Sequence, residues 1–484
     1  DLMLPTIATG NVGSALAGEY EVANSLRFDD GSNDYLTRTF SAGNRKTWSF
    51  STWIKRCNLT NANMNILGTD YSGSGEAYLL FKSGEQLHYG QYEGGGTSNN
   101  YSFQTNQAFR DNSAWYNILF VWDTTQSTSS DRMKLYVNGT QVTSFSSSTY
   151  PSLNLDGVWN SGRVHYIGDA YYGTNLDGYL CETVFCDGTV LSPTDVGEFD
   201  DSGIWKPIDV SGLSFGTNGF YQEYKQSGTS ANSSGLGADT SGNDHHFTVN
   251  NLTAVDQSTD TCTNNGCTLN PLVQAGSISS GATHTFSNGN LSLTGGTSKW
   301  IADYGTFALT TGKWFYEIKL TTFSSPSGSP IRVGWGAIND VVKDNNIYFR
   351  GLTYDLQGIV RYGSGGTDGG TTTGRTAFVQ GDIVSIAIDI DNDEITFYKN
   401  GSVTNVEDFD YSSLTTNIKR SLDFAIAPHI VMYANNSNAV DYNFGSPPYS
   451  ESGGNSDGNG YGNFSMAVPS GYYSLNSKNL AEFG

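Results

Sequence analysis

The chain has 484 residues, of which 37% are hydrophobic, 13% are aromatic and only 15% are charged. This proportion of large apolar side chains excludes a disordered chain, and the abundance of Gly, Ser, Thr, Asn and Tyr excludes an all-helical protein or a coiled-coil fibre. The net charge of −22 argues against a nucleic-acid partner and against docking on anionic membranes, and no apolar run reaches the roughly 18 residues needed for membrane insertion.

Four strand-like segments mark the first half of the chain. Residues 47–54 alternate polar and apolar side chains, as a half-buried strand does, and residues 114–123 form a more apolar run suited to the centre of a sheet. Residues 133–137 run into an Asn-Gly pair at 138–139, the strongest short-range signal for a hairpin. Residues 178–185 supply the fourth strand. Closely spaced strands and turns of this kind predict an antiparallel sandwich.

The second half repeats this pattern. Strand-like runs cover residues 312–320, 331–335 and 382–390. A further run at 394–399 ends in an Asn-Gly pair at 400–401, which repeats the hairpin signal of the first half. The sequence therefore predicts an all-β protein with two antiparallel sandwiches of related architecture.

Composition sets the expected boundaries. We expect an N-terminal arm at 1–19 and a first sandwich at 20–225. Residues 226–284 are rich in Ser, Thr, Asn and Gly and are expected to form an irregular connector. A second sandwich is expected at 285–450. The tail at 451–484 regains apolar residues after a Gly-rich loop, so we expect it to pack on a domain or on a neighbouring molecule.

Five cysteines are too few, and odd in number, for a disulfide scaffold. We expect buried thiols in a protein made in a reducing compartment. Cys262 and Cys267 flank a short turn and could approach each other.

Each half resembles a known domain family. The first half resembles the laminin-G-like branch of the concanavalin A-like jelly rolls, through residues 24–30, 48–54, 115–116, 134–139 and 176–180. The second half resembles a SPRY domain, through residues 312–317, 333–335, 381–384, 389–391, 397–401 and 427–429. Both resemblances imply concanavalin A-like jelly-roll sandwiches.

The joined arrangement resembles a family of tailed-bacteriophage structural proteins common in marine viruses. The residues that carry this likeness are 189–193, 203–207, 216–221, 239–243 and 263–272. The resemblance implies a component of the particle surface that is made in the host bacterial cytoplasm and contacts other virion proteins.

An acidic cluster, Asp389, Asp391 and Asp393, lies at a predicted strand end. Alternate residues of a strand share one face, so three carboxylates could converge on calcium or on a glycosidic bond. The cluster leads into a hairpin and lacks the glycine of a calcium-binding loop, so we favour a structural turn and keep calcium as an alternative.

Oxygen-rich turns also occur in the first half. The resemblance to laminin-G-like domains implies that such turns can hold calcium at the rim of a sandwich, and the alternative is a plain Asx turn. The candidate ligands there are Asp29, Asp30, Asp34, Asp169 and Asp177.

No catalytic residue is predicted, and we expect no enzyme. Two Gly-x-Ser-x-Gly segments, at 212–216 and 454–458, match the nucleophile-elbow pattern, but neither follows a convincing parallel strand or leads into a helix.

Aromatic residues in Gly-, Ser- and Asn-rich segments are the candidate ligand-binding residues. Tyrosine beside small polar residues is typical of binding loops, and sugars stack on aromatic faces. The alternative is packing along the sandwich. The candidates are Tyr71, Tyr89, Tyr92, Tyr101, Trp159, Tyr171 and Tyr172.

These observations favour a non-enzymatic virion surface protein, a tail-fibre or appendage adhesin that binds a host surface glycan or protein through many weak sites. A capsid decoration or head-fibre protein that makes protein–protein contacts is the alternative, and a glycan depolymerase is the least favoured. The low charge and the many tyrosines also predict a homo-oligomer.

Overall fold

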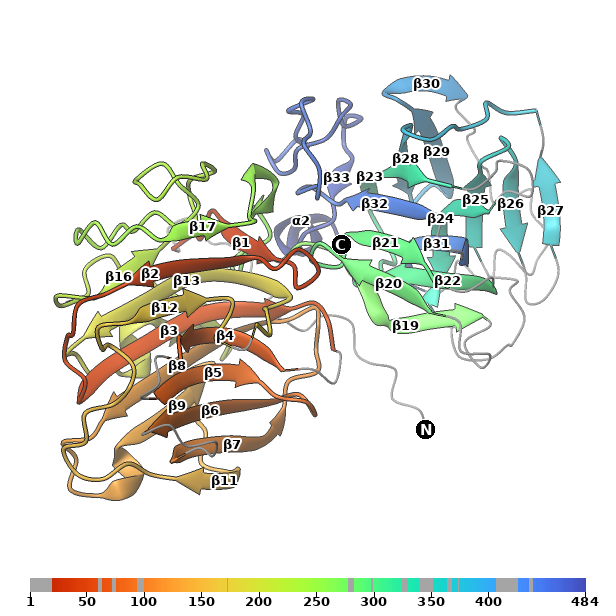
Figure 1. Cartoon of the computed structure of the whole chain (residues 1–484). Helices are drawn as coiled ribbons and strands as arrows, with labels where there is room; N and C mark the ends of the chain where they lie inside the picture. The colour runs from red at the N-terminus through yellow and green to blue at the C-terminus, as the bar shows by residue number, and fades with distance from the viewer. Residues whose placement is uncertain are drawn as a thin grey trace. The chain divides into compact units, whose positions relative to one another are not determined.

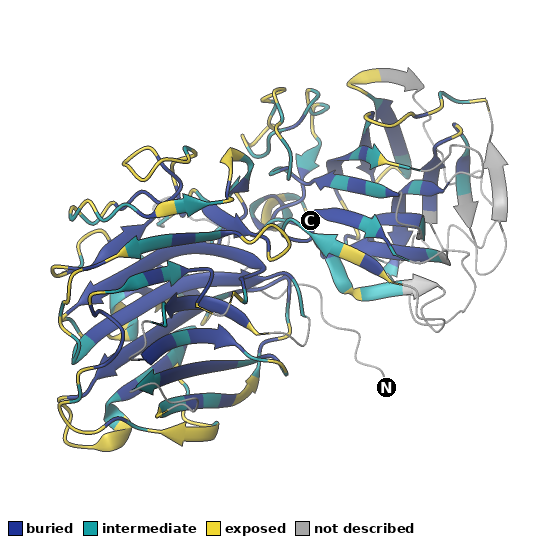
Figure 2. Ribbon diagram, viewed as in Figure 1, coloured by how far each residue is buried: buried dark blue, intermediate teal, exposed yellow. Residues whose placement is uncertain are grey.

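The computed structural model describes residues 20–59, 63–71, 75–93, 100–171, 173–276, 283–296, 299–323, 330–338, 351–363, 368–372, 374–405, 425–434 and 438–484. These residues form two compact units, which we call the first unit (20–264) and the second unit (265–484) (Figure 1). In both units the strands consist mainly of buried residues, and exposed residues concentrate in the loops (Figure 2).

The first unit is a sandwich of two antiparallel sheets, which we call sheets A and B. The strand order in sheet A is β10-β9-β8-β3-β13-β1-β18, with β16 paired to β13. Its strands are β1 (Ser25–Phe28), β3 (Thr47–Arg56), β8 (Trp115–Asp123), β9 (Met133–Val137), β10 (Thr140–Gln141), β13 (Gly178–Asp187), β16 (Phe220–Gln222) and β18 (Gln257–Ser258).

Sheet B has the strand order β11-β7-β6-β5-β4-β12-β2-β17. Its strands are β2 (Tyr35–Thr39), β4 (Met64–Thr69), β5 (Gly75–Phe81), β6 (Gln86–Glu93), β7 (Tyr101–Ala108), β11 (Phe145–Thr149), β12 (Val164–Ile167) and β17 (Thr248–Asn250). A separate two-stranded sheet contains β14 (Gly197–Phe199) and β15 (Trp205–Pro207). Short 3-10 helices span Ser129–Asp131, Pro193–Asp195 and Ala254–Asp256.

Aromatic side chains fill the space between sheets A and B. Trp48 lies 5.3 Å from Phe120 and 6.1 Å from Trp122, measured between ring centroids. Tyr89 of sheet B packs on Phe120 of sheet A at 4.6 Å. Such pairs add to the free energy gained by burial of the rings, so this cluster holds the two sheets together.

The outer face of sheet A is also covered. Leu119 and Val184 on that face lie in a buried cluster with Leu191, Phe215 and Tyr221, which belong to the chain that follows β13. Strand β13 is consequently buried on both faces along its whole length. The first unit therefore has a third layer, which covers sheet A.

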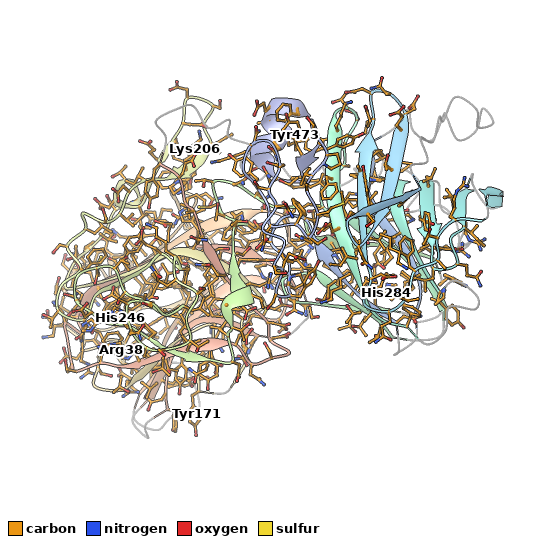
Figure 3. The ribbon with its side chains drawn as sticks, turned by 90° about the horizontal axis from the view of Figure 1, so that it is seen from above. Arg38, Tyr171, Lys206, His246, His284 and Tyr473 are labelled. Atoms are coloured by element: carbon orange, nitrogen blue, oxygen red, sulfur yellow. The ribbon has the colours of Figure 1, made fainter. Side chains whose placement is uncertain are left out.

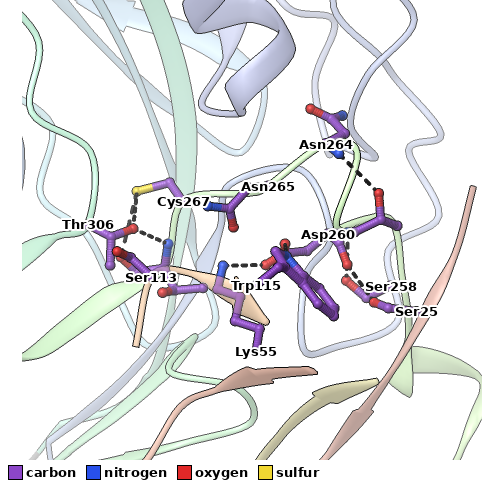
Figure 4. Close-up of polar contacts among 12 residues, drawn as sticks. Ser25, Lys55, Ser113, Trp115, Ser258, Asp260, Asn264, Asn265, Cys267 and Thr306 are labelled. Atoms are coloured by element: carbon purple, nitrogen blue, oxygen red, sulfur yellow. Dashed lines mark hydrogen bonds and ion pairs between the residues drawn. The ribbon is translucent and has the colours of Figure 1, made fainter. Parts of the chain in front are cut away.

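Asp260 fastens another covering segment to sheet A (Figure 4). Its carboxylate accepts hydrogen bonds from Lys55 Nζ (2.8 Å) and Trp115 Nε1 (3.2 Å), and its carbonyl oxygen accepts one from Ser25 Oγ (2.6 Å). Because Lys55 is fully buried, its charge requires the Asp260 carboxylate beside it.

The segment 226–284, expected to be an irregular connector, is largely built into the two units. Strands β17 and β18 pair at the edges of sheets B and A. Strand β19 (Leu269–Gly276) pairs at the edge of a sheet in the second unit. Cys262 contacts Cys181, with 3.5 Å between the two sulfur atoms, and Cys267 contacts Thr306 in the second unit. All five cysteines are buried and free of disulfides.

The second unit contains two further antiparallel sheets, C and D. Sheet C has the order β19-β22-β31-β24-β25-β26-β27. The strands that follow β19 in this order are β22 (Lys299–Gly305), β31 (Ile426–Ala434), β24 (Ile331–Ala337), β25 (Gly351–Asp355), β26 (Val360–Gly363) and β27 (Asp368–Thr372).

Sheet D has the order β20-β21-β32-β23-β28-β29-β30, and β33 (Tyr473–Ser474) pairs in parallel with β23. Its strands are β20 (His284–Ser287), β21 (Ser292–Gly295), β32 (Ala439–Asn443), β23 (Lys313–Thr322), β28 (Ile383–Asp389), β29 (Glu394–Lys399) and β30 (Ser402–Asn405). Helix α2 (Ser477–Phe483) lies near the C-terminus. The predicted all-β fold with two antiparallel jelly-roll sandwiches is confirmed.

The C-terminal segment 451–484 covers the outer face of sheet D. Phe464 is fully buried and meets Phe315 of β23 edge to face at 5.0 Å. Glu317, two residues further along β23, is fully buried and accepts hydrogen bonds from Ser465 Oγ (2.6 Å), the Ser465 N–H (2.9 Å) and Ser385 Oγ (3.1 Å). Burial raises the pKa of Glu317, and the Ser465 and Ser385 hydrogen bonds oppose that rise.

We expect Glu317→Ala to release this segment, because the Ser465 and Ser385 hydroxyl groups would lose their acceptor. The free energy of unfolding of the second unit should fall by about 2–4 kcal/mol. Urea unfolding would measure this loss, and proteolysis at the Gly-rich loop 453–460 should accelerate. Glu198→Ala, at an exposed position of the first unit, is the control. Equal effects of the two substitutions would contradict this role of Glu317.

Candidate functional site

The outer face of sheet B carries side chains that are partly open to solvent. On β5, Ala77 and Leu79 point into the core, whereas Tyr78 between them points to the other side and is half-buried. Cross-strand pairing places Tyr166 of β12, Gly68 of β4 and Tyr78 in one row. Adjacent strands are about 4.8 Å apart, so the two tyrosines stand about 10 Å apart with a glycine between them.

Six tyrosines gather in three pairs at this face, and we call them the tyrosine face. Ring centroids are 6.0 Å apart in the first pair, 5.5 Å in the second and 6.0 Å in the third. In the third pair the two hydroxyl oxygens are also 3.4 Å apart. The pairs are Tyr35 with Tyr166, Tyr71 with Tyr171, and Tyr78 with Tyr92.

Gly68 determines how the loop after β12 rests on sheet B. A Cβ atom at Gly68 would lie 2.4 Å from Ala170 Cβ and 2.7 Å from the Asp169 carbonyl oxygen, so only glycine permits this close approach. The Gly168 N–H donates to the Ile66 carbonyl (3.0 Å), which fixes the start of the loop. Tyr171 follows directly, with 51% of its surface exposed, at the periphery of the unit (Figure 3).

Two carboxylates accompany the tyrosines. Burial raises the pKa of Tyr166, and the charges of Asp70 and Asp169 raise it further, so both carboxylates lie within electrostatic reach of this phenol. Burial also raises the pKa of Asp169. The Oδ1 atoms of both aspartates are buried and accept no hydrogen bond from a described residue. This end of the face therefore combines aromatic rings with negative charge.

The other end of the face is polar and carries a cation. His88 lies beside Tyr78, with 5.8 Å between ring centroids, and burial lowers the pKa of His88 to about 4, so the ring is neutral near pH 7. Lys82 Nζ donates to Gln104 Oε1 (3.1 Å). Burial raises the pKa of Glu76, the cross-strand partner of Tyr92, to about 7.

The candidate aromatic residues lie in different places in the structure, some on the tyrosine face and others in the core. It brings Tyr71, Tyr92 and Tyr171 to the tyrosine face. Tyr89 and Trp159 are only 2% exposed and pack in the core, so their expected position on binding loops is wrong. Tyr101 is half-buried and packs against the same core. Tyr172 lies outside the described residues.

Sequence analysis missed Tyr35, Tyr78 and Tyr166. All three lie in strands, each next to a residue that faces the core. The feature of the sequence that could have indicated these tyrosines is their alternation with the buried residues Leu36, Leu79 and Ile167. Alternation in the sequence separates the two faces of a strand. It does not reveal that other segments cover the outer face of sheet A, whereas the outer face of sheet B is partly open to solvent.

Four of the candidate aspartates of the first half, Asp29, Asp30, Asp34 and Asp177, lie close to one another. Asp29 Oδ1 accepts from the Gly31 N–H (2.9 Å), and Asp34 Oδ2 accepts from the Asp29 N–H (3.1 Å). Burial raises the pKa of Asp34 to about 6. Burial also raises the pKa of Asp177 well above its usual value, and the charges of Asp30 and Asp29 add to that rise.

The acidic cluster of the second half is occupied by protein donors. Asp389 pairs with Lys313 Nζ (2.6 Å) and accepts from Asn392 Nδ2 (2.8 Å). Both oxygens of Asp391 lie 3.2 Å from the Gly312 N–H, and Asp393 has a turn conformation with φ of +56°. Across the described ranges, no group of three or more His, Cys, Asp or Glu side chains is arranged to hold a metal ion. Calcium binding by any of these aspartates stays a prediction.

Two family models match the chain. Residues 30–197 match the concanavalin A-like lectin/glucanases superfamily, and residues 313–446 match the SPRY domain. The first unit thus contains a laminin G-like, concanavalin A-like domain and the second a SPRY domain. Both are binding-type rather than catalytic domains. No curated protein sequence matches the chain.

The solved structures to which this chain is similar share little sequence with it. The SPRY domain of human HERC1 is 18% identical over 36% of this chain and 96% of its own, with a TM-score of 0.27. A Bacteroides ovatus protein described as carbohydrate-binding is 14% identical over 48% and 60%, with a TM-score of 0.33. Domains LG4-5 of the mouse laminin alpha1 chain are 12% identical over 90% of this chain and 92% of their own, with a TM-score of 0.30.

In the part of the chain that the structure describes, no helix has the length and apolarity to cross a membrane.

Gly68→Ala should lift the loop that carries Tyr171, because the added methyl group would overlap Ala170. We expect faster amide exchange at Gly168 and a loss of about 1–3 kcal/mol in the free energy of unfolding of the first unit. Gly212→Ala is the matched control, since nothing lies within 4 Å of a Cβ atom there. Unchanged exchange in the Gly68 variant would show that the loop does not depend on this contact.

Proposed function

We propose that this protein is a non-enzymatic glycan-binding protein and that the tyrosine face is its binding surface. The observation that carries the proposal is the Tyr71–Tyr171 ring pair beside Asp70 and Asp169, two carboxylates whose charges also act on Tyr166 of the Tyr35–Tyr166 pair. Aromatic rings offer flat apolar surfaces at low entropic cost, and polar neighbours can adapt to sugar hydroxyls.

The arrangement of the remaining polar groups supports binding rather than catalysis. The two Gly-x-Ser-x-Gly segments lie in turns and loops, and the acidic cluster at Asp389–Asp393 is taken up by a hairpin. The concanavalin A-like match over residues 30–197 is compatible with recognition of a carbohydrate.

We further propose that the protein is displayed on the surface of a tailed-bacteriophage particle, as part of a tail fibre or similar appendage. The support is the likeness of segments such as 189–193 and 263–272 to phage structural proteins. Several copies on one particle, held by other virion proteins or by self-association, would sum weak glycan contacts into stable attachment to a host cell.

The combined substitution Tyr71→Ala and Tyr171→Ala should reduce glycan binding by about tenfold or more, because a lost aromatic contact is worth roughly 1.4 kcal/mol or more. A glycan array, followed by titration of the strongest ligand, would measure the change. Phe199→Ala is the control, since Phe199 is an exposed aromatic residue of the same unit on the separate β14–β15 sheet. Equal binding by the double variant and the unaltered protein would refute the assigned surface.

Cryo-electron microscopy of intact particles tests the proposed location. We expect density for this chain at a tail or fibre tip. Density spread regularly over the capsid would instead assign the protein to head decoration and overturn the adhesin proposal, whatever glycan the protein binds in isolation.

A further inference from the structure

We propose that the tyrosine face discriminates against acidic glycans and accepts glycans that present hydroxyl or ammonium groups. This inference rests on the proposed glycan-binding function and concerns the class of ligand. It follows from the charges that surround the Tyr35–Tyr166 and Tyr71–Tyr171 pairs.

The negative charges lie next to the rings on which a sugar would stack. Asp70 immediately precedes Tyr71, and Asp169 lies two residues before Tyr171, so one carboxylate accompanies each tyrosine of that pair. Both carboxylates also act electrostatically on the phenol of Tyr166, a member of the Tyr35–Tyr166 pair. Asp169 is only 7% exposed, and its Oδ1 accepts no hydrogen bond from a described residue. The backbone of Ala170 interacts with this carboxyl group and opposes part of the rise in its pKa that burial causes.

The cations near this end of the face do not form an anion site. Arg45 lies within electrostatic reach of Arg163, and its Nε donates to the carbonyl oxygen of Gly157 (2.6 Å). Arg163 acts electrostatically on Asp70, but its donors are directed at the chain: Nη1 donates to the carbonyl oxygens of Gly75 (2.5 Å) and Asp70 (3.2 Å), and Nε donates to Ser161 Oγ (2.8 Å). Lys82, at the other end of the face, donates to Gln104. The segments 72–74 and 94–99 contain no ionisable residue.

An acidic sugar would therefore bring its carboxylate or sulfate towards like charges, whereas a hydroxyl or ammonium group would supply the donors that carboxylates accept. An ammonium group gains additionally from the tyrosine rings, whose faces attract cations. The net charge of −22 adds a weaker, salt-sensitive repulsion at longer range.

Matched pairs of glycans test the inference with the full-length chain. Suitable probes are dextran with dextran sulfate, methyl-esterified pectin with polygalacturonate, and N-acetylated with deacetylated chitohexaose. We expect the acidic member to bind at least tenfold more weakly than its neutral partner at low salt, with a smaller difference at high salt. The deacetylated, cationic chitohexaose should bind at least as well as the acetylated form.

The combined substitution Asp70→Asn and Asp169→Asn should reduce the ratio of the affinities for neutral and acidic probes about fivefold or more, because each amide removes the negative charge and keeps an acceptor oxygen. The control is the combined Asp201→Asn and Glu198→Gln, at two exposed positions of the β14–β15 hairpin, which changes the net charge by the same amount. If the control variant reduces the ratio of neutral-probe to acidic-probe affinity as much as the Asp70 and Asp169 variant does, the local role of these two aspartates is overturned.

The outcomes separate this inference from the proposed function. Acidic members that bind as well as their neutral partners, with binding sensitive to Tyr71→Ala and Tyr171→Ala, would overturn the charge selection and leave glycan binding intact. No binding to any member of the three pairs or to a glycan array would overturn both.

Discussion

Buried carboxylates hold the outer layers of this protein onto its sheets. A carboxylate removed from water is tolerated only where donors surround it, so each such group requires a particular segment to lie beside it. Glu317 requires Ser465 of the C-terminal segment, and Asp260 pairs with Lys55 of sheet A. Glu182 accepts hydrogen bonds from the hydroxyls of Tyr20 and Tyr221, and burial raises its pKa to about 7.

These attachments decide which sheet faces are available to a ligand. In the first unit the covering segments occupy the outer face of sheet A, where Tyr221 and Trp205 are buried among side chains of β8 and β13. In the second unit the C-terminal segment occupies the outer face of sheet D. Sheet B keeps half-exposed tyrosines on its outer face. The outer face of sheet B is therefore available as the proposed binding surface because the covering segments pack on sheets A and D.

The tyrosine face itself depends on one close backbone contact. The loop after β12 can rest on β4 only because Gly68 has no side chain, and this contact projects Tyr171 beside Tyr71. The carboxylate of Asp169 is carried into the face by the same loop. Shape and charge of the face are therefore coupled: a change that moves the loop moves an aromatic ring and a negative charge together.

Local sequence signals were sufficient for the strands, the turns and the fold class. The Asn-Gly pairs at 138–139 and 400–401 have positive φ at both residues and join β9 to β10 and β29 to β30, because a two-residue hairpin turn requires that conformation. Period-two alternation likewise predicted the strands, since it reflects the pleat of each strand alone. Of the tyrosine face, the sequence indicated only Tyr71, Tyr92 and Tyr171, through the Gly-, Ser- and Asn-rich segments around them, and Asp169 only as a candidate calcium ligand.

The tertiary structure alone decided which aromatic residues are open to solvent. Tyr89 and Tyr78 lie in neighbouring strands, yet Tyr89 is buried between the sheets and Tyr78 is half-exposed. Trp159 is buried although glycine and polar residues surround it in the sequence. The physical reason is that burial depends on which distant segment packs on a face, and the contacts that fix those segments, such as Glu317 with Ser465 or Gly68 with Ala170, join residues far apart in the chain.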